Sequence, residues 1–143
     1  MSDVIRNLMS QNVISVAPNQ SIQEAASLMS QHNVGSLPVV ENGQLRGMIT
    51  DRDITLRSTA QGLDGNTTVS QCMSTDLVQG TPDMDVHDAA KLMAQGQIRR
   101  LPVVENQRLL GMVSLGDLAT RQPYENEAGE ALSNISIPSQ PKA

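Results

Sequence analysis

The stretch Gly47-Met48-Ile49-Thr50-Asp51-Arg52-Asp53 decides the fold, because a close copy of it, Gly111-Met112-Val113-Ser114-Leu115-Gly116-Asp117, follows 64 residues later. The same offset aligns residues 9–54 with residues 73–118 without a gap, and 18 of the 46 aligned pairs are identical. An internal repeat of this quality outranks any local prediction of secondary structure. The chain is therefore expected to use one supersecondary unit twice, and any site is expected in two versions.

The sequence around each motif predicts the order of helices and strands within a repeat. Apolar residues at helical spacing follow a capping residue, Ser21 in the first copy and Asp85 in the second. A buried strand is expected over 36–41, and Asn42-Gly43 predicts a tight hairpin that leads into a second strand. A further helix is expected from Thr50 to about Thr59. The predicted fold class is α+β, with two β-α-β-β-α repeats packed together with pseudo-two-fold symmetry.

The repeat also predicts where the domains begin and end. We expect a first domain over 3–60, a turn-rich linker over 61–67, a second domain over 68–121, and a C-terminal helix with a frayed tail over 122–143. A short amphipathic helix is expected over 2–9. A unit of about 60 residues buries too little surface to be stable alone, so the two halves are expected to pack together. The C-terminal helix is expected to cover apolar surface of the module or of a partner subunit, and the sequence does not choose between them.

Composition restricts the classes of partner. The net charge is −5, the pI is near 4.8, and the chain has one Tyr but no Phe or Trp, which disfavours nucleic acid. The single cysteine, Cys72, excludes an internal disulfide and a cysteine-rich zinc site. No signal peptide and no apolar run of membrane-spanning length is evident. These features predict a cytoplasmic protein that binds neither nucleic acid nor a membrane.

The sequence contains no pattern that favours catalysis. His32 and His87 do not occupy equivalent repeat positions, and neither lies near a Ser or Cys nucleophile motif. No P-loop, no dinucleotide fingerprint and no metal-ligand spacing is present. The protein is therefore predicted not to be an enzyme.

Both copies carry the pattern Gly-apolar-x-Thr/Ser-x-x-Asp, and Leu-Pro-Val-Val precedes each hairpin. In these motifs, over about residues 3–121, the chain resembles a tandem pair of cystathionine-β-synthase (CBS) domains, also called a Bateman module. The resemblance implies binding of an adenosine-containing ligand, namely AMP, ADP, ATP or S-adenosylmethionine. It also implies a homodimer in which four CBS units form a flat disc.

The repeated motif has residue types that suit a nucleotide. Thr50 and Asp53 lie where a strand gives way to a helix, and a helix N-terminus offers unpaired N–H groups to a phosphate. An ionised Asp is an acceptor that can receive both hydroxyls of a ribose. Ser114 and Asp117 are the equivalent pair in the second copy. The alternative interpretation is structural, because Ser/Thr-x-x-acid is also the pattern of a helix N-cap.

The two predicted sites differ in charge. Arg99-Arg100 is the most concentrated basic feature, whereas the matching positions of the first copy are Gly35-Ser36. Resemblance to the γ subunit of AMP-activated kinase implies that this segment of one CBS unit faces the phosphates of a ligand held by the Asp of the other. The alternative for the two arginines is a solvated pair or a salt bridge. The first predicted site therefore combines Thr50, Arg52 and Asp53 with Arg99 and Arg100, and the second combines Ser114 and Asp117 with Gly35 and Ser36.

Adenine needs a flat apolar slot, which aliphatic residues must form in a chain with so few aromatic residues. All of the candidates are also ordinary core residues. By family position, they are Ile14, Val34, Pro38 and Met48 for one site, and Val78, Ile98, Pro102 and Met112 for the other.

Three functional hypotheses follow. The first is a regulatory module that binds an adenosine-containing ligand between its two CBS domains and transmits the ligand state to an effector protein. The second is a dimeric interaction protein in which the motifs serve only as helix caps. The third, an enzyme of nucleotide metabolism, has the least support.

Overall fold

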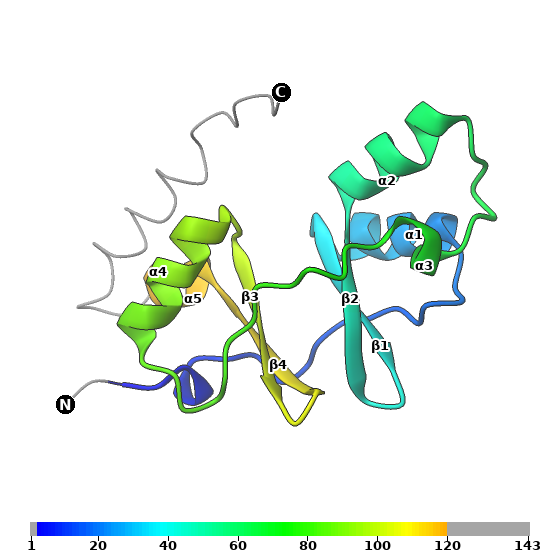
Figure 1. Cartoon of the computed structure of the whole chain (residues 1–143). Coiled ribbons are helices and arrows are strands. Elements are labelled where there is room, and N and C mark those ends of the chain that lie inside the picture. Colours follow the sequence, from blue (N-terminus) through cyan, green and yellow to red (C-terminus); the bar gives the residue numbers. More distant parts are fainter. Residues whose placement is uncertain (1–2, 120–143) are drawn as a thin grey trace. The chain divides into compact units, whose positions relative to one another are not determined.

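The computed structural model describes residues 3–119, which form two compact units (Figure 1). The first-repeat unit consists of Val13–Leu77 together with Gln107–Leu109. The second-repeat unit consists, in its described part, of residues 3–12, Val78–Asn106 and residues 110–119. Each unit has its own cluster of buried apolar side chains.

The first-repeat unit contains the predicted helix, hairpin and following helix in order, but the leading strand of the predicted β-α-β-β-α repeat is only an isolated bridge between Val16 and Val39. The first helix, α1, begins and ends where its caps dictate. The Ser21 hydroxyl accepts a hydrogen bond from the Glu24 backbone N–H at 3.1 Å, and Asn33 ends the helix in the left-handed region at φ 53°. Its elements are α1 (Ile22–His32), β1 (Ser36–Glu41), β2 (Gln44–Thr50), α2 (Asp51–Arg57), the 3₁₀ turn η2 (Thr59–Gln61) and α3 (Val69–Cys72).

The hairpin of β1 and β2 determines where the motif lies. Asn42 and Gly43 both have positive φ, 53° and 79°, which is the turn geometry that an Asn-Gly pair favours. The antiparallel register starts with Glu41 opposite Gln44 and ends with Ser36 opposite Thr50. The hairpin therefore brings the start of β1 beside the hydroxyl residue of the motif.

The second-repeat unit contains the equivalent elements, together with a turn from the start of the chain. Asp85 caps its long helix as predicted, because the carboxylate accepts a hydrogen bond from the His87 N–H at 2.8 Å. Its hairpin turns at Asn106 and Gln107, which have φ of 52° and 69°. The elements are η1 (Ile5–Asn7), α4 (Val86–Gly96), β3 (Arg100–Glu105), β4 (Arg108–Ser114) and α5 (Leu115–Ala119).

Strands β1 and β2 form an antiparallel pair, and the start of β4 pairs with β2 within the first-repeat unit. Gln44 of β2 pairs with Arg108, and the adjoining Leu45 N–H donates to the Gln107 carbonyl at 2.9 Å. Residues 107–109 are therefore grouped with the first-repeat unit. The prediction of an α+β fold built from two repeats is confirmed.

The segment that precedes each repeat packs with the other repeat. Ser10 exchanges two backbone hydrogen bonds with Met112, at 2.8 and 3.0 Å, within the second-repeat unit. Ser74 does the same with Met48, at 2.8 and 3.0 Å, within the first-repeat unit. Each unit thus includes the lead-in segment of the other repeat. The domain boundaries expected from the sequence follow the repeats along the chain, and they stay a prediction.

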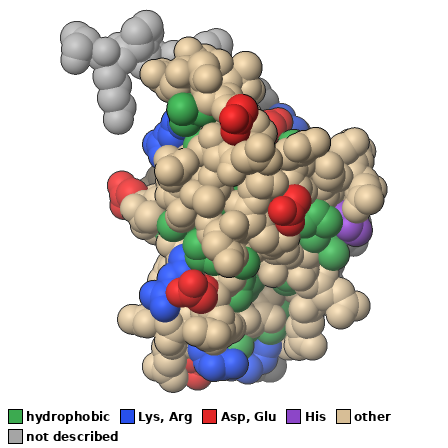
Figure 2. Space-filling view, turned by 90° about the vertical axis from the view of Figure 1, so that its right-hand side faces the viewer, with side chains coloured by type: hydrophobic (Ala, Val, Ile, Leu, Met, Phe, Trp, Pro, Cys, Tyr) green, Lys and Arg blue, Asp and Glu red, His purple; other side chains and the backbone are tan. Residues whose placement is uncertain are grey.

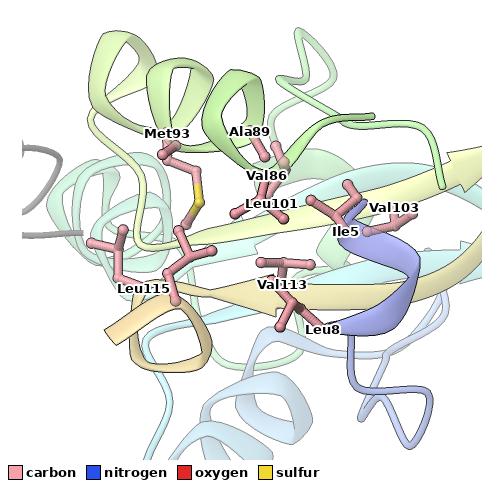
Figure 3. Close-up of a cluster of buried hydrophobic side chains, with 11 residues drawn as sticks. Ile5, Leu8, Val86, Ala89, Met93, Leu101, Val103, Val113 and Leu115 are labelled. Atoms are coloured by element: carbon pink, nitrogen blue, oxygen red, sulfur yellow. The ribbon is translucent and has the colours of Figure 1, made fainter. Parts of the chain in front are cut away.

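The two lead-in segments, residues 3–12 and 67–76, are called the exchanged segments, because each lies in the unit of the other repeat. Both contribute to the cores of the units that they join. In the second-repeat unit, Ile5 and Leu8 of the lead-in segment pack among buried side chains of α4 and of the strands (Figure 3). In the first-repeat unit, Val69 and Cys72 of α3 are fully buried beside Ile49. Burial of an aliphatic side chain stabilises the folded state by roughly 1.5–3 kcal/mol, so these segments are integral parts of the units that they join.

Two helices are shorter than predicted. The helix expected over 2–9 is a single 3₁₀ turn, because the Ile5 and Arg6 N–H groups donate to the carbonyls of Met84 and Pro82, at 3.0 and 3.1 Å. The helix that follows Thr50 ends at Arg57, after which η2 begins. The helix expected within 122–143 lies outside the described residues. No helix within residues 3–119 has the length and apolar character needed to cross a membrane.

Candidate ligand-binding site

The Thr50 and Asp53 side chains form a reciprocal capping box at the start of α2. Thr50 is extended, at φ −114° and ψ 161°, and its Oγ1 accepts a hydrogen bond from the Asp53 N–H at 2.9 Å. Asp53 Oδ2 in turn accepts from the Thr50 N–H at 3.0 Å. Two helix-terminal donors are thus satisfied, and the Asp53 carboxylate is held in a defined orientation.

The second copy of the motif has the same geometry. Ser114 Oγ accepts from the Asp117 N–H at 3.1 Å, and Asp117 Oδ2 accepts from the Ser114 N–H at 2.9 Å. The alternative interpretation of these residues as helix caps therefore describes their local role correctly in both units. A cap leaves part of a carboxylate available, so this role does not exclude a ligand.

Two neighbours of Asp53 were missed by the sequence analysis. Ser74 Oγ donates to Asp53 Oδ1 at 3.4 Å, and Arg57 Nε lies 3.8 Å from the same oxygen. The spacing of Asp53 and Arg57 on α2, four residues apart, is a signal that could have been read. Ser74 carries no such signal, because it belongs to the exchanged segment. With these neighbours in place, the Asp53 side chain is 12% exposed.

The segment that precedes the first strand of each hairpin lies against the motif of its own unit. The Asp51 N–H donates to the Gly35 carbonyl at 2.9 Å, and the Leu115 N–H donates to the Arg99 carbonyl at 3.0 Å. Gly35 therefore adjoins the start of α2, and Arg99, which is exposed, adjoins the start of α5. The predicted combination of Asp53 with Arg99 and Arg100 joins residues of different units and stays a prediction, as does that of Asp117 with Gly35 and Ser36.

The charge around the start of α2 favours a hydroxyl over a phosphate as the group that approaches Asp53. Asp51 and Asp53 both lie in the first turn, and their charges offset the positive end of the helix. Arg52 is exposed, and the basic side chain that forms an ion pair with Asp53 is Arg57. On the face drawn in Figure 2, acidic and basic side chains are interspersed rather than gathered by sign. An anionic phosphate therefore needs arginines from elsewhere, whereas a hydroxyl group can donate directly to the carboxylate.

The proposed adenine-slot residues differ in exposure. Ile14 is 38% exposed and is the most accessible of those in the first-repeat unit. Val34 is half-buried and packs against the core, whereas Pro38 is buried opposite Met48 in the hairpin. In the second-repeat unit, Val78 and Ile98 are half-buried against the core, and Pro102 and Met112 are buried. Most of these residues therefore have a packing role, whether or not they also contact a ligand.

Within residues 3–119, no group of three or more His, Cys, Asp or Glu side chains is arranged to hold a metal ion.

Two curated relatives are similar to the chain over most of their length. It is 61% identical over 132 residues to the CBS domain-containing protein YhcV of Bacillus subtilis, covering 92% of this chain and 94% of that protein. It is 32% identical over 120 residues to hypoxic response protein 1 of Mycobacterium tuberculosis, covering 82% and 84%.

Solved structures share the fold. The crystal structure of Hypoxic Response Protein I with two coordinated zinc ions has a TM-score of 0.77 at 32% identity, covering 85% of this chain and 100% of that one. The CBS domain pair of MJ0100 in complex with 5′-methylthioadenosine and S-adenosyl-L-methionine gives 0.73 at 30%, covering 84% and 95%. CBSX2 in complex with AMP gives 0.71 at 25%, covering 80% and 91%.

The sequence model of the CBS domain matches twice, over residues 4–58 and 69–123, which contain the two capping-box motifs described above. The chain therefore belongs to the CBS domain family, as a protein with a tandem pair of CBS domains.

Proposed function

We propose that the protein is a regulatory module that binds an adenosine-containing ligand, AMP, ADP, ATP or S-adenosylmethionine, between its two CBS domains. The complexes of MJ0100 with 5′-methylthioadenosine and S-adenosylmethionine, and of CBSX2 with AMP, support this class of ligand. The proposal involves no catalytic step. It agrees with the 61% identical relative YhcV, a CBS domain-containing protein that the chain covers over 94% of its length.

The observation that carries the proposal is the capping box at Thr50 and Asp53. The box fixes the carboxylate through one oxygen and leaves acceptor positions that ribose hydroxyls can use. In the proposed site, Arg52, Arg99 and Arg100 neutralise the phosphates, because guanidinium groups match phosphate with forked donors. Ser114 and Asp117 form the second site, with Gly35 and Ser36 facing a less charged part of the ligand.

Binding would act on the protein by linkage. A ligand that contacts both CBS domains stabilises the arrangement in which both contacts are made. In the proposed homodimer, a four-CBS disc, that arrangement is read by an effector protein. The adenine slot is formed by the apolar side chains named above, of which Ile14 is the most exposed in its unit.

The proposal is tested by calorimetric titration of the full-length protein with AMP, ADP, ATP and S-adenosylmethionine. The variants are Asp53→Asn and Asp117→Asn, since an amide oxygen can still accept the capping hydrogen bond while the charge is removed. We expect binding to weaken at least tenfold in one or both variants with little change in melting temperature. Absence of binding to all four ligands by the wild-type protein would contradict the proposal.

The second candidate is a dimeric interaction protein that uses the motifs only as helix caps. The reciprocal hydrogen bonds at both motifs favour it, because they account for both residue pairs without a ligand. It predicts that sedimentation gives the same dimer with and without nucleotide, and that neither Asp→Asn variant changes a binding isotherm.

A further inference from the structure

The two oxygens of the Asp53 carboxylate are not equally accessible to a ligand, because the Ser74 and Arg57 side chains both face Oδ1. A carboxylate offers about four lone-pair positions, two on each oxygen. The Thr50 N–H uses one on Oδ2 at 3.0 Å, while Ser74 Oγ, at 3.4 Å, and Arg57 Nε, at 3.8 Å, both face Oδ1. Oδ2 therefore keeps an open position for one ligand hydroxyl, whereas a second hydroxyl that approaches Oδ1 competes with the Ser74 hydroxyl and the Arg57 guanidinium.

The neighbours differ in how readily they can leave. The Thr50 N–H belongs to the capping box, so its loss would open the first turn of α2. The Ser74 and Arg57 contacts are longer and use side chains that can rotate. A second hydroxyl at Oδ1 would therefore compete with Ser74 and Arg57 rather than with the capping box.

Both displaceable residues connect Asp53 to the exchanged segment. Arg57 Nη1 donates to the carbonyls of Met73 and Cys72, at 3.1 and 3.4 Å, at the C-terminal end of α3. Ser74 is itself part of the segment and pairs with Met48 through two backbone hydrogen bonds. The Asp53 carboxylate thus belongs to the candidate site and, through Ser74 and Arg57, also helps to hold residues 72–74 in place.

We propose that Arg57 and Ser74 are positioning residues that set the specificity of Asp53 for one ligand hydroxyl over two, and that binding of a ribose cis-diol loosens residues 72–74. This inference rests on the proposed function, because it concerns the same carboxylate. A ligand with a single sugar hydroxyl uses the open position on Oδ2 and leaves the contacts of Ser74 and Arg57 with Oδ1 intact. A ribose gains a second hydrogen bond, but Asp53 then loses a contact to residues 72–74. The contributions of the two hydroxyl groups to the binding free energy therefore do not add fully.

The first test compares AMP with 2′-deoxy-AMP, which lacks one hydroxyl of the diol, by calorimetry on the full-length protein. The measured quantity is the ratio of the 2′-deoxy-AMP Kd to the AMP Kd. We expect this ratio to rise threefold to tenfold in Ser74→Ala, because the second hydroxyl then no longer competes with Ser74 for Oδ1. Ser70→Ala is the matched control, since Ser70 lies on α3, is exposed, and contacts Thr68 rather than Asp53.

The second test measures how firmly residues 72–74 are held in place. Its probe is Cys72, the single cysteine of the chain, which is fully buried at the end of α3. Labelling with a thiol reagent in native buffer reports opening of this segment. We expect Arg57→Ala to label at least fivefold faster than wild type without ligand, and Arg57→Lys to restore part of the protection. Arg46→Ala, which removes a comparable exposed ion pair with Glu41, is expected to label at the wild-type rate.

With ligand, we expect Cys72 to label faster at saturating AMP than at saturating 2′-deoxy-AMP. Equal labelling rates, together with an unchanged Kd ratio in Ser74→Ala, would overturn the inference and leave the proposed function standing. If neither nucleotide binds, both fail together. If Arg57→Ala labels at the wild-type rate in the absence of ligand, Arg57 does not hold residues 72–74 in place, and this part of the inference is overturned.

Discussion

Gly47 and Ser74 lie so close that a Cβ atom at position 47 would stand 2.8 Å from the Ser74 carbonyl oxygen and 2.9 Å from Met73 Sδ. The equivalent pair repeats the relationship, because a Cβ at Gly111 would stand 2.6 Å from the Ser10 carbonyl oxygen. Both glycines are buried in the strand that leads to the motif. The glycine that opens each motif is therefore required by the exchanged segment that crosses it.

The first prediction concerns these two glycines. Gly47→Ala and Gly111→Ala should each lower the free energy of unfolding by about 1–3 kcal/mol, because the backbone of the exchanged segment must move away. Gly116→Ala is the control. Its Cβ would lie 3.5 Å from Ser114 Oγ, an ordinary contact, and alanine favours a helix. Urea denaturation measures all three, and a Gly47→Ala protein as stable as wild type would contradict the close approach.

The second prediction concerns the caps. Thr50→Val removes the hydroxyl that accepts the Asp53 N–H and should cost about 1 kcal/mol of stability, while Thr50→Ser should cost little. Thr55→Val is the control, since its hydroxyl only donates to the Asp51 carbonyl within the exposed helix. Thermal unfolding measures the three variants. Equal melting temperatures for Thr50→Val and Thr50→Ser would show that the cap contributes nothing.

Local signals accounted for much of the fold. The strand over 36–41 and the turn at Asn42-Gly43 were predicted at the observed positions, because an Asn-Gly pair favours positive φ at both residues. The caps at Ser21 and Asp85 were predicted because a side chain at the N-cap position can accept a hydrogen bond from an N–H group of the first helical turn. The repeat then extended each local prediction to its second copy.

The exchange of lead-in segments had no local signal. The pairing of Ser10 with Met112 joins residues that are far apart in the chain, and such backbone pairing leaves little trace in side-chain patterns. Its one trace in the sequence is the pair of motif glycines, Gly47 and Gly111, and these also belong to the predicted ligand motif. The contacts of Asp53 with Ser74 and of Arg57 with the Met73 carbonyl depend on the equivalent pairing of Ser74 with Met48. The sequence therefore predicted Asp53 but not the neighbours that contact it.

The third prediction concerns Ser58, at the end of α2. Its side chain is 1% exposed, and its hydroxyl has no hydrogen-bond partner within the described part of the chain. Burial of a hydroxyl without a partner is unfavourable, so Ser58→Ala should raise the free energy of unfolding by about 1 kcal/mol. Thr59→Ala, at the exposed neighbouring position, should change it by less than about 0.5 kcal/mol. A destabilised Ser58→Ala protein would contradict the assignment.

The fourth prediction concerns alkaline pH. Burial raises the pKa of the Cys72 thiol above its ordinary value near 9.0; the Asp53 charge adds to this and the Arg57 charge opposes it. A folded-state pKa above the unfolded value contributes stability that is fully present below pH 9 and is lost as pH rises through the folded pKa. Wild-type stability should therefore fall more steeply above about pH 9 than that of Cys72→Ala. Urea denaturation at pH 8, 9 and 10 measures the difference, and parallel curves would contradict it.

The last prediction concerns Ile5 and Val69, which are equivalent in the repeat and are both fully buried, but in different cores. Ile5→Ala should cost about 2–5 kcal/mol and Val69→Ala about 2 kcal/mol, because each leaves a cavity in a packed cluster. Since Ile5 packs with the second repeat, its variant should increase amide hydrogen exchange in β3 and β4 first, and Val69→Ala should do so in β1 and β2. The opposite assignment would mean that each lead-in segment packs with the repeat that it precedes. The affected strands thus distinguish exchanged segments from segments that stay with their own repeat.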